Sequence, residues 1–302
     1  MTQPSDPRLT PARPDLAAAH LRGTLKAARF VEGRGMTVAA PLAPLRRAPA
    51  EDAPLDTECL FGETVTVYDT AGGWAWVQCA TDGYVGYLPA AALAPGEPAS
   101  APAPAPTHRV ATAAAHLYAA AGVKVPVLAR LPWGARVTVL DHGPAANTTA
   151  TYARLRLPDG REAHAPSAQL APLDQPADWV SEAAARLGVP YLWGGRSGDG
   201  LDCSSLVQLA LATAAIAIPR DSDQQDALPA RILAPAEAPR RGDLAFWPGH
   251  VGIMLDSGTL LHANAWAMAV AAEPLAAAAS RIEAESGARP TLKRLACVDP
   301  GT

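Results

Sequence analysis

Three residues in the C-terminal third of the chain have types that could perform nucleophilic chemistry: Cys203, His250 and His262. Cys203 follows Asp202, a residue type favoured at helix N-caps, and precedes an apolar run with helical spacing. A thiol in the first turn of a helix meets unpaired N–H groups and the positive end of the helix dipole, so we expect a lowered thiol pKa. A buried core thiol would fit the same position, and the residue type leaves both interpretations open.

The two histidines fall on two predicted neighbouring strands, His250–Leu255 and Thr259–Ala263, which a tight turn at Asp256-Ser257-Gly258 would join. Side chains alternate along a strand, so His250 and His262 are expected on the same face. One imidazole could then accept the thiol proton while the other orients it. The alternative is two structural histidines that meet by chance.

A zinc site is the other chemistry that one cysteine and two histidines can support. Cys203, His250 and His262 lack the close paired spacing of common zinc motifs, and Asp202 resembles a helix cap more than a ligand. We therefore expect neither a metal nor another cofactor.

The elements that must position these residues follow an α+β order, with helices first and antiparallel strands after them. An apolar stripe of Val180, Ala183, Ala184 and Leu187 predicts a first helix. A second helix is predicted from Cys203 to about Ala215. Strands are then expected at Asp243–Trp247, His250–Leu255 and Thr259–Ala263.

The N-terminal half contains a repeated pattern of short strand-like runs separated by turns, which is typical of small β-barrels. The segment 62–67, GETVTV, is similar to 134–139, GARVTV. Glu63 and Tyr84 of the first copy are replaced by Ala135 and Arg161 in the second. We predict an arm at 1–23, a first barrel at 24–95, an Ala/Pro linker at 96–106, a second barrel at 107–173, and the α+β domain at 174–302.

Composition narrows the classes of function. The chain has 302 residues, a formal net charge of −4 and no dense Lys/Arg run, which disfavours a nucleic-acid partner or a polybasic membrane patch. Its first residues lack a secretory pattern, so we expect a cytoplasmic protein. We expect its four cysteines to be free thiols, with Cys59 and Cys79 as small buried residues. The sequence does not define an oligomeric state.

The region from about Ala177 to the C-terminus resembles the NlpC/P60 family of cell-wall cysteine peptidases. The resemblance rests on six segments in the family's order: Tyr191-Leu192-Trp193-Gly194-Gly195, Leu201-Asp202-Cys203-Ser204, Pro219-Arg220-Asp221-Ser222 with Gln225, Arg241-Gly242-Asp243-Leu244, Gly249-His250-Val251-Gly252-Ile253, and His262-Ala263-Asn264. With bacterial SH3-like barrels in front, the whole chain is similar to γ-D-glutamyl-L-diamino acid endopeptidases that process murein peptides. The fold implied is a papain-like catalytic domain behind two SH3-like barrels.

The resemblance also implies roles for individual residues. Cys203 would attack the γ-D-glutamyl carbonyl, with His250 as general base and then acid, and with His262 as the orienting group. Tyr191 would donate a hydrogen bond to the oxyanion or the substrate, unless it is only a core aromatic. Two further residues, Asp202 and Ser204, match positions that line the substrate subsite. Asp202 could bind the free amine of an N-terminal L-Ala, although an N-cap role alone would also explain this residue, and the two roles are compatible.

In related enzymes the first SH3-like barrel covers part of the cleft. Glu63 and Tyr84 match positions that face the substrate amine there, which would favour peptides with a free N-terminal L-Ala. Solvated surface is the alternative interpretation of Glu63. The sequence departs from the family at Ser205, where glycine is usual, and at Trp266-Ala267, which replaces a stretch that is often His-rich.

The expected partner is therefore a murein peptide, and the expected process is the recycling of cell-wall peptides. Three other functions stay open: a lytic enzyme that acts on intact wall, a wall-peptide binding protein with little or no catalysis, and a thiol acyltransferase on the same fold. The complete set of Cys203, His250 and His262 disfavours the binding protein, because binding alone needs none of them.

Overall fold

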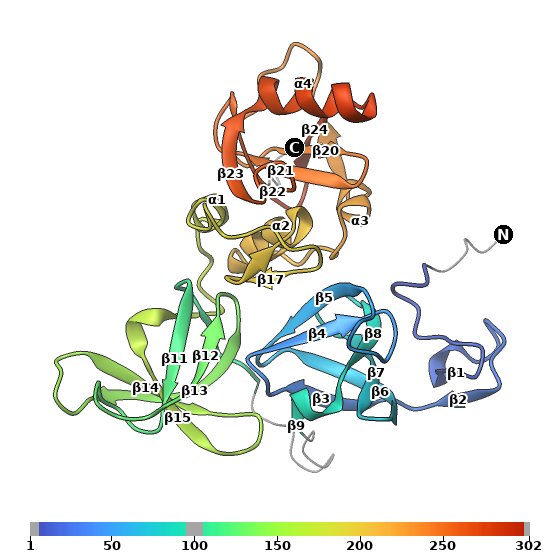
Figure 1. The fold of residues 1–302 in the computed structure, drawn as a ribbon. Coiled ribbons are helices and arrows are strands. Elements are labelled where there is room, and N and C mark those ends of the chain that lie inside the picture. The colour runs from blue at the N-terminus through green and yellow to red at the C-terminus, as the bar shows by residue number, and fades with distance from the viewer. Residues whose placement is uncertain (1–5, 95–104, 299–302) are drawn as a thin grey trace. The chain divides into compact units, whose positions relative to one another are not determined.

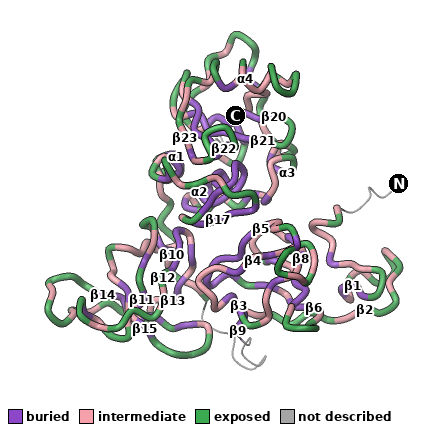
Figure 2. Tube along the Cα trace, in the orientation of Figure 1, coloured by how far each residue is buried: buried purple, intermediate pink, exposed green. Residues whose placement is uncertain are grey.

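The computed structural model describes residues 6–94 and 105–298, and the chain forms two compact units, Met1–Asp174 and Gln175–Thr302 (Figure 1). Most of the predicted Ala/Pro linker lies outside the described residues. Figure 2 shows buried residues along the strands of both units and along the helix that follows residue 202.

A seven-stranded antiparallel sheet forms the first β module, here residues 34–94, with the strand order β5-β4-β8-β7-β6-β3-β9. Its strands are β3 (Arg34–Val38), β4 (Leu42–Arg46), β5 (Leu55–Leu60), β6 (Thr64–Ala71), β7 (Trp74–Cys79), β8 (Val85–Pro89) and β9 (Leu93–Ala94), with the 3-10 helix η2 (Ala90–Ala92) between the last two. The runs predicted from turn residues and β-branched side chains therefore do form strands.

The second β module, residues 108–172, repeats this architecture with the order β12-β11-β15-β14-β13-β10-β16. Its elements are β10 (His108–Val110), β11 (Ala114–Tyr118), β12 (Val127–Pro132), β13 (Arg136–Pro144), β14 (Thr151–Arg156), β15 (Glu162–Pro166), η3 (Ser167–Gln169) and β16 (Leu170–Pro172). The β6–β7 register shifts between Val67 and Asp69, and the β13–β14 register shifts at the matching Val139 and Asp141. The equal order and equal bulges agree with the sequence repeat.

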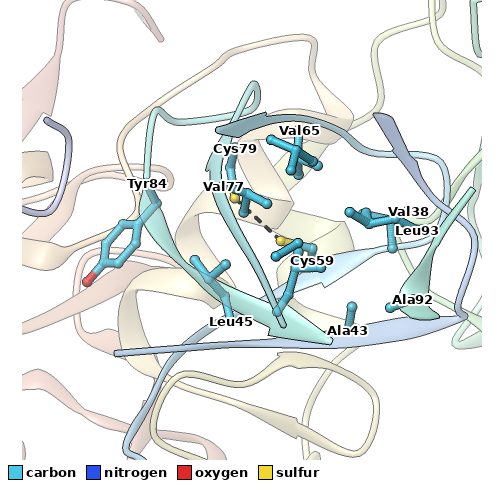
Figure 3. Packing of buried hydrophobic residues seen from close by; sticks show 13 residues of the cluster. Val38, Ala43, Leu45, Cys59, Val65, Val77, Cys79, Tyr84, Ala92 and Leu93 are labelled. Atoms are coloured by element: carbon cyan, nitrogen blue, oxygen red, sulfur yellow. Dashed lines mark hydrogen bonds between the residues drawn. The ribbon is translucent and has the colours of Figure 1, made fainter. Parts of the chain in front are cut away.

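Each β module has its own apolar core. In the first core the Sγ atoms of Cys59 and Cys79 lie 3.4 Å apart among aliphatic side chains (Figure 3). Both residues are buried free cysteines, as expected from the sequence. Phe61 follows β5 but packs in the second core, and its carbonyl accepts a hydrogen bond of 2.8 Å from the Arg136 N–H. This contact joins the two modules within the first unit.

The N-terminal arm packs on the first β module. It contains β1 (Leu16–Ala18) and η1 (Ala19–Leu21), and β1 pairs in parallel with β2 (Arg29–Val31). The Arg13 guanidinium donates to Asp69 at 2.6 Å and to the Tyr87 hydroxyl at 3.1 Å, and it lies 4.5 Å from the centre of the Trp76 ring. The arm is thus held by an ion pair and by cation–π contacts.

The second unit contains a six-stranded antiparallel sheet with the order β19-β24-β20-β21-β22-β23. Its elements are α1 (Trp179–Ala184), β17 (Arg196–Ser197), β18 (Gly200–Leu201), α2 (Cys203–Thr213), α3 (Ser222–Asp226), β19 (Ala230–Ile232), β20 (Leu244–Trp247), β21 (His250–Met254), β22 (Thr259–Asn264), β23 (Ala269–Pro274), α4 (Leu275–Ser286) and β24 (Thr291–Leu295). Helix α2 contacts β21 and β22, and α4 contacts β22 and β23.

The predicted helices and strands occur in the second unit with small shifts at their ends. The largest difference concerns the first helix, because α1 ends at Ala184 and Leu187 is 53% exposed rather than buried. Val180 and Ala183 of the predicted stripe are buried, and Trp179 completes the buried face of α1 in place of Leu187. No helix in the described part of the chain is long and apolar enough to cross a bilayer.

Candidate active site

Cys203 is the first residue of α2, and the sequence around it explains why the helix begins there. Asp202 has an extended backbone, and its carboxylate accepts a hydrogen bond of 2.8 Å from the Ser205 N–H. The Ser205 hydroxyl accepts one of 3.0 Å from the Asp202 N–H, which completes a capping box. The departure from glycine at residue 205 therefore contributes to the cap.

The surroundings of Cys203 correct one expectation about its thiol. Burial, together with the negative charge of Asp202, raises the Cys203 pKa to about 12. The Val251 N–H opposes these effects by stabilising the thiolate. The expected lowering at a helix N-terminus is therefore wrong for the resting site, because burial and a neighbouring carboxylate outweigh the helix dipole. The contact with Val251 also brings the sulfur to the start of β21, next to His250 in sequence.

The two histidines are neighbours on adjacent strands, as their spacing predicts. The Nε2 atom of His250 lies 2.8 Å from the Nδ1 atom of His262. A Cβ atom at Gly252 would lie 2.6 Å from the Leu260 side chain and 3.2 Å from His262 Cβ, so the glycine leaves room for the close approach of β22. Burial and the second imidazole lower the pKa of His250 to about 3. His250 is therefore a neutral base at neutral pH.

Sequence reasoning missed Glu273, on β23. Its Oε1 atom lies 2.8 Å from His262 Nε2, and Arg281 of α4 donates two hydrogen bonds to its carboxylate at 2.8 and 2.6 Å. Hydrogen bonding by Arg281 lowers the pKa of Glu273 to about 2. A signal was present, because Glu273 is the only charged residue in the strand 269–274, AVAAEP.

Asp202 and Ser204 lie in a buried polar cluster with Arg220, which is 1% exposed. Arg220 donates to both oxygens of the Asp202 carboxylate at 3.0 and 2.6 Å and to the Ser204 hydroxyl at 2.9 Å. The Gly194 N–H donates to the same carboxylate at 2.9 Å. Burial acts to raise the Asp202 pKa, but Arg220 lowers it overall. The carboxylate is thus engaged by internal donors, which favours its cap role over a bond to a substrate amine.

Tyr191 lies close enough to Cys203 and Asp202 for both to affect its hydroxyl. Burial, together with the charges of Cys203 and Asp202, raises the Tyr191 pKa to about 12. Its N–H donates to the Met268 carbonyl at 2.9 Å, which fixes the loop before α2 against the turn before β23. A neutral Tyr191 hydroxyl near the sulfur remains a hydrogen-bond donor at neutral pH.

Glu63 and Tyr84 belong to the first β module, in the other unit. Glu63 is 5% exposed and accepts hydrogen bonds from the Leu60 N–H at 2.8 Å and the Thr81 hydroxyl at 3.2 Å, so it is not solvated surface. Tyr84 belongs to the apolar core, and Figure 3 shows its hydroxyl pointing away from the other core residues. That these two residues face the substrate amine stays a prediction.

Zinc binding is the other use that a cysteine and two histidines could have. Within residues 6–94 and 105–298, no group of three or more His, Cys, Asp or Glu side chains is arranged to hold a metal ion. The contacts of Asp202 and His262 instead lie within hydrogen-bond networks of the protein. The arrangement is that of a thiol with a nearby pair of imidazoles, which can carry out nucleophilic catalysis.

Comparison with known proteins identifies two domains within the chain. The family model named NlpC/P60 matches residues 188–281, a stretch that contains the thiol, both histidines and the Glu273–Arg281 pair. Residues 188–281 form an NlpC/P60 domain. Residues 45–93 match the bacterial dipeptidyl-peptidase SH3 domain, so an SH3 domain precedes the NlpC/P60 domain, and it includes Glu63 and Tyr84.

Individual relatives extend the likeness beyond this domain. The chain is 28% identical over 231 residues to the γ-D-glutamyl-L-lysine dipeptidyl-peptidase of Bacillus cereus, which covers 69% of this chain and 67% of that protein. It is 40% identical over 114 residues to the peptidoglycan endopeptidase RipB of Mycobacterium tuberculosis, which covers 32% of this chain and 46% of RipB. The chain thus matches only part of the length of these relatives. An NlpC/P60 family protein of Bacillus cereus has a similar fold, with a TM-score of 0.66 at 24% identity over 80% of this chain and 94% of that one.

Proposed function

We propose that this protein is a cysteine endopeptidase that hydrolyses the γ-D-glutamyl–L-diamino acid bond of murein peptides. The proposal rests on the imidazoles of His250 and His262, whose facing nitrogens lie 2.8 Å apart. His250 directly precedes Val251, the strand residue whose N–H contacts the sulfur of Cys203. A structural thiol needs no base of this kind. The similarity to a γ-D-glutamyl-L-lysine dipeptidyl-peptidase over 69% of this chain supports the choice of bond.

In the proposed reaction, Cys203 Sγ attacks the γ-carbonyl carbon of D-Glu while its proton passes to His250. The tetrahedral intermediate collapses when His250 gives this proton to the departing amine of the diamino acid, which leaves a thioester on Cys203. A water molecule, deprotonated by His250, then attacks the thioester and releases the acyl peptide with the thiol restored.

The resting pKa values fit a proton transfer that accompanies substrate attack. Burial raises the pKa of Cys203 to about 12 and lowers that of His250 to about 3, so each isolated charge is disfavoured. When the proton moves from sulfur to imidazole, two opposite charges form next to each other and stabilise one another. Backbone N–H groups at the start of α2 and the Tyr191 hydroxyl are the proposed donors to the oxyanion.

We further propose that the substrate has a free N-terminal L-Ala, and that the protein acts on released wall peptides in the cytoplasm. A buried ammonium group needs a charged partner, and the buried carboxylate of Glu63 in the SH3 domain is the candidate. The matching strand order of the second β module supports its assignment as a second SH3-like copy. That copy has Ala135 where the first has Glu63, so only the first could bind the amine.

The test is mass spectrometry of L-Ala-γ-D-Glu-diaminopimelate after incubation with the full chain, beside the same peptide with an N-acetyl group. We expect release of L-Ala-D-Glu from the free-amine peptide only, with Cys203→Ala inactive. Cleavage of both peptides would support the endopeptidase activity but contradict the proposed requirement for a free N-terminal amine. Binding without cleavage by the wild type would reject the endopeptidase in favour of a peptide-binding protein.

A further inference from the structure

A line of hydrogen bonds continues beyond the two histidines to two further elements of the NlpC/P60 domain, β23 and α4. His250 contacts His262, His262 contacts Glu273, and Glu273 is held by Arg281, with all donor–acceptor distances between 2.6 and 2.8 Å. The side chain of His262 is 0% exposed and those of Glu273 and Arg281 are 20% and 18% exposed. The Arg281 guanidinium lies 5.1 Å from the centre of the Trp266 ring, which partly covers it.

This line fixes where the protons lie on the two imidazoles. Glu273 is ionised, because Arg281 lowers its pKa to about 2, and a carboxylate can only accept hydrogen bonds. His262 must therefore carry its proton on Nε2 and offer the lone pair of Nδ1 to His250. His250 in turn must donate from Nε2, which leaves the lone pair on its Nδ1 atom. That nitrogen is then the one able to accept the thiol proton.

We propose that Glu273, oriented by Arg281, is a positioning residue that selects the base-competent tautomer of His250 through His262. The inference rests on the proposed function, because Cys203 and His250 are the groups it serves. Glu273 acts through His262, the imidazole that its carboxylate contacts. Without its charge, His262 can carry its proton on Nδ1 instead, and the direction of the line reverses. His250 then receives a hydrogen bond at Nε2 and holds its own proton on Nδ1, where it blocks acceptance from sulfur.

Glu273→Gln is the decisive substitution because it keeps the shape of the side chain. Arg281 donates to both oxygens of Glu273, and one of them, Oε1, also contacts His262 Nε2. An amide supplies one oxygen where the carboxylate supplied two, so it does not hold the Nε2–H form of His262 in both of its orientations. When the amide N–H faces His262 Nε2, that nitrogen must accept, and the line of hydrogen bonds reverses. Glu273→Asp keeps an acceptor-only carboxylate and serves as the conservative variant. Glu285→Gln is the matched control, because Glu285 is an exposed residue of α4 whose charge acts on Arg281 and not on the imidazoles.

The direct measurement is the tautomeric state of His250 and His262 by ¹⁵N NMR of histidine-labelled full-length protein at pH 7. In the wild type and in Glu285→Gln, both rings should carry the proton on Nε2. In Glu273→Gln, the form with the proton on Nδ1 should become populated in both rings. A proton on Nδ1 of His250 in the wild type overturns the proposal without any variant, and so does an unchanged tautomer in folded Glu273→Gln.

Kinetics give the second readout. Glu273→Gln should lower kcat about 10- to 100-fold with little change in KM, because substrate contacts are intact. Glu273→Asp should recover part of the loss, and Glu285→Gln should match the wild type. Equal losses in the Gln and Asp variants, together with a lowered melting temperature, would reveal a merely structural role. If the wild type cleaves no murein peptide, the proposed function fails while the NMR result still decides this inference.

Discussion

The thiols of the SH3 domain and the thiol of the NlpC/P60 domain share several properties. Cys59 and Cys79 are 1% and 7% exposed, and Cys203 is 8% exposed. The contact with Cys59 and burial raise the pKa of Cys79 well above its usual value, and burial raises that of Cys203 to about 12. Neither burial nor the resting pKa therefore distinguishes a nucleophile from a core residue in this protein.

The difference lies in the neighbours. Cys59 and Cys79 face each other across 3.4 Å within an aliphatic core, which includes no histidine. Cys203 begins a helix, receives the Val251 N–H, and adjoins a strand that carries a neutral imidazole. The lesson is that a buried thiol becomes useful when a base is positioned to take its proton during attack, even if the isolated thiolate is disfavoured.

The largest expected effect is on the nucleophile itself. Cys203→Ala should lower kcat/KM on the order of 10⁵-fold, since no other group can form the thioester. Cys79→Ala removes an equally buried thiol and should leave activity unchanged. Hydrolysis of the murein peptide, followed by amine-specific labelling of the released diamino acid, measures both. A comparable loss from Cys79→Ala would end the distinction between the two sites.

Loss of His262 from the imidazole pair should make Cys203 behave more like the core thiols. His262→Ala is expected to lower kcat/KM by about 10²- to 10⁴-fold, because His250 loses its orienting partner. Alkylation of Cys203 by iodoacetamide should slow toward the rate of Cys59 and Cys79. Peptide mapping by mass spectrometry gives the three rates in one sample. His142→Ala, an exposed histidine of the second β module, is the control and should change neither quantity.

The response to acid should also separate the two regions. Burial holds the pKa of His250 at about 3 in the folded protein, against 6.5 as its ordinary value. Between these values the unfolded chain binds a proton that the folded domain does not, so stability falls as pH drops from 6.5 toward 3, by up to about 1.4 kcal/mol per pH unit.

Hydrogen–deuterium exchange, corrected for the intrinsic effect of pH, localises this loss. Protection of α2 and β21 should fall between pH 6.5 and 4, while protection of β5 and β7 around Cys59 and Cys79 should change less. His250→Gln should flatten the curve for α2 and β21. An equally steep curve in that variant would show that other groups set the acid response.

Much of the site was predictable because it depends on local patterns. The Asp202 cap places Cys203 at the start of a helix. The length of the tight turn at residues 256–258 determines which residues of the two strands share a face, and it brings His250 and His262 to the same one. The repeat of GETVTV and GARVTV predicted two sheets, and they have the same strand order.

What escaped prediction depends on tertiary contacts. The pKa of Cys203 is set by burial and by Asp202. The spacing of residues in the sequence predicts neither how deeply the thiol is buried nor the electrostatic effect of the charges around it. Glu273 reaches His262 only because β23 pairs with β22 in a register that aligns it opposite Leu260, one pleat from His262. Arg220, 18 residues from Asp202 in sequence, engages the same carboxylate that sequence reasoning assigned to a substrate amine.

The smallest expected effect concerns the core thiols. Cys79→Ala removes a sulfur from a packed core and should destabilise the protein by about 1 kcal/mol, through lost contacts and a small cavity. Cys79→Val restores volume without a thiol and should recover most of that loss, because the site needs an apolar group of this size rather than a nucleophile. Urea unfolding followed by the fluorescence of the tryptophans in β7 measures both variants. If valine proved more damaging than alanine, the 3.4 Å contact with Cys59 would matter for more than packing.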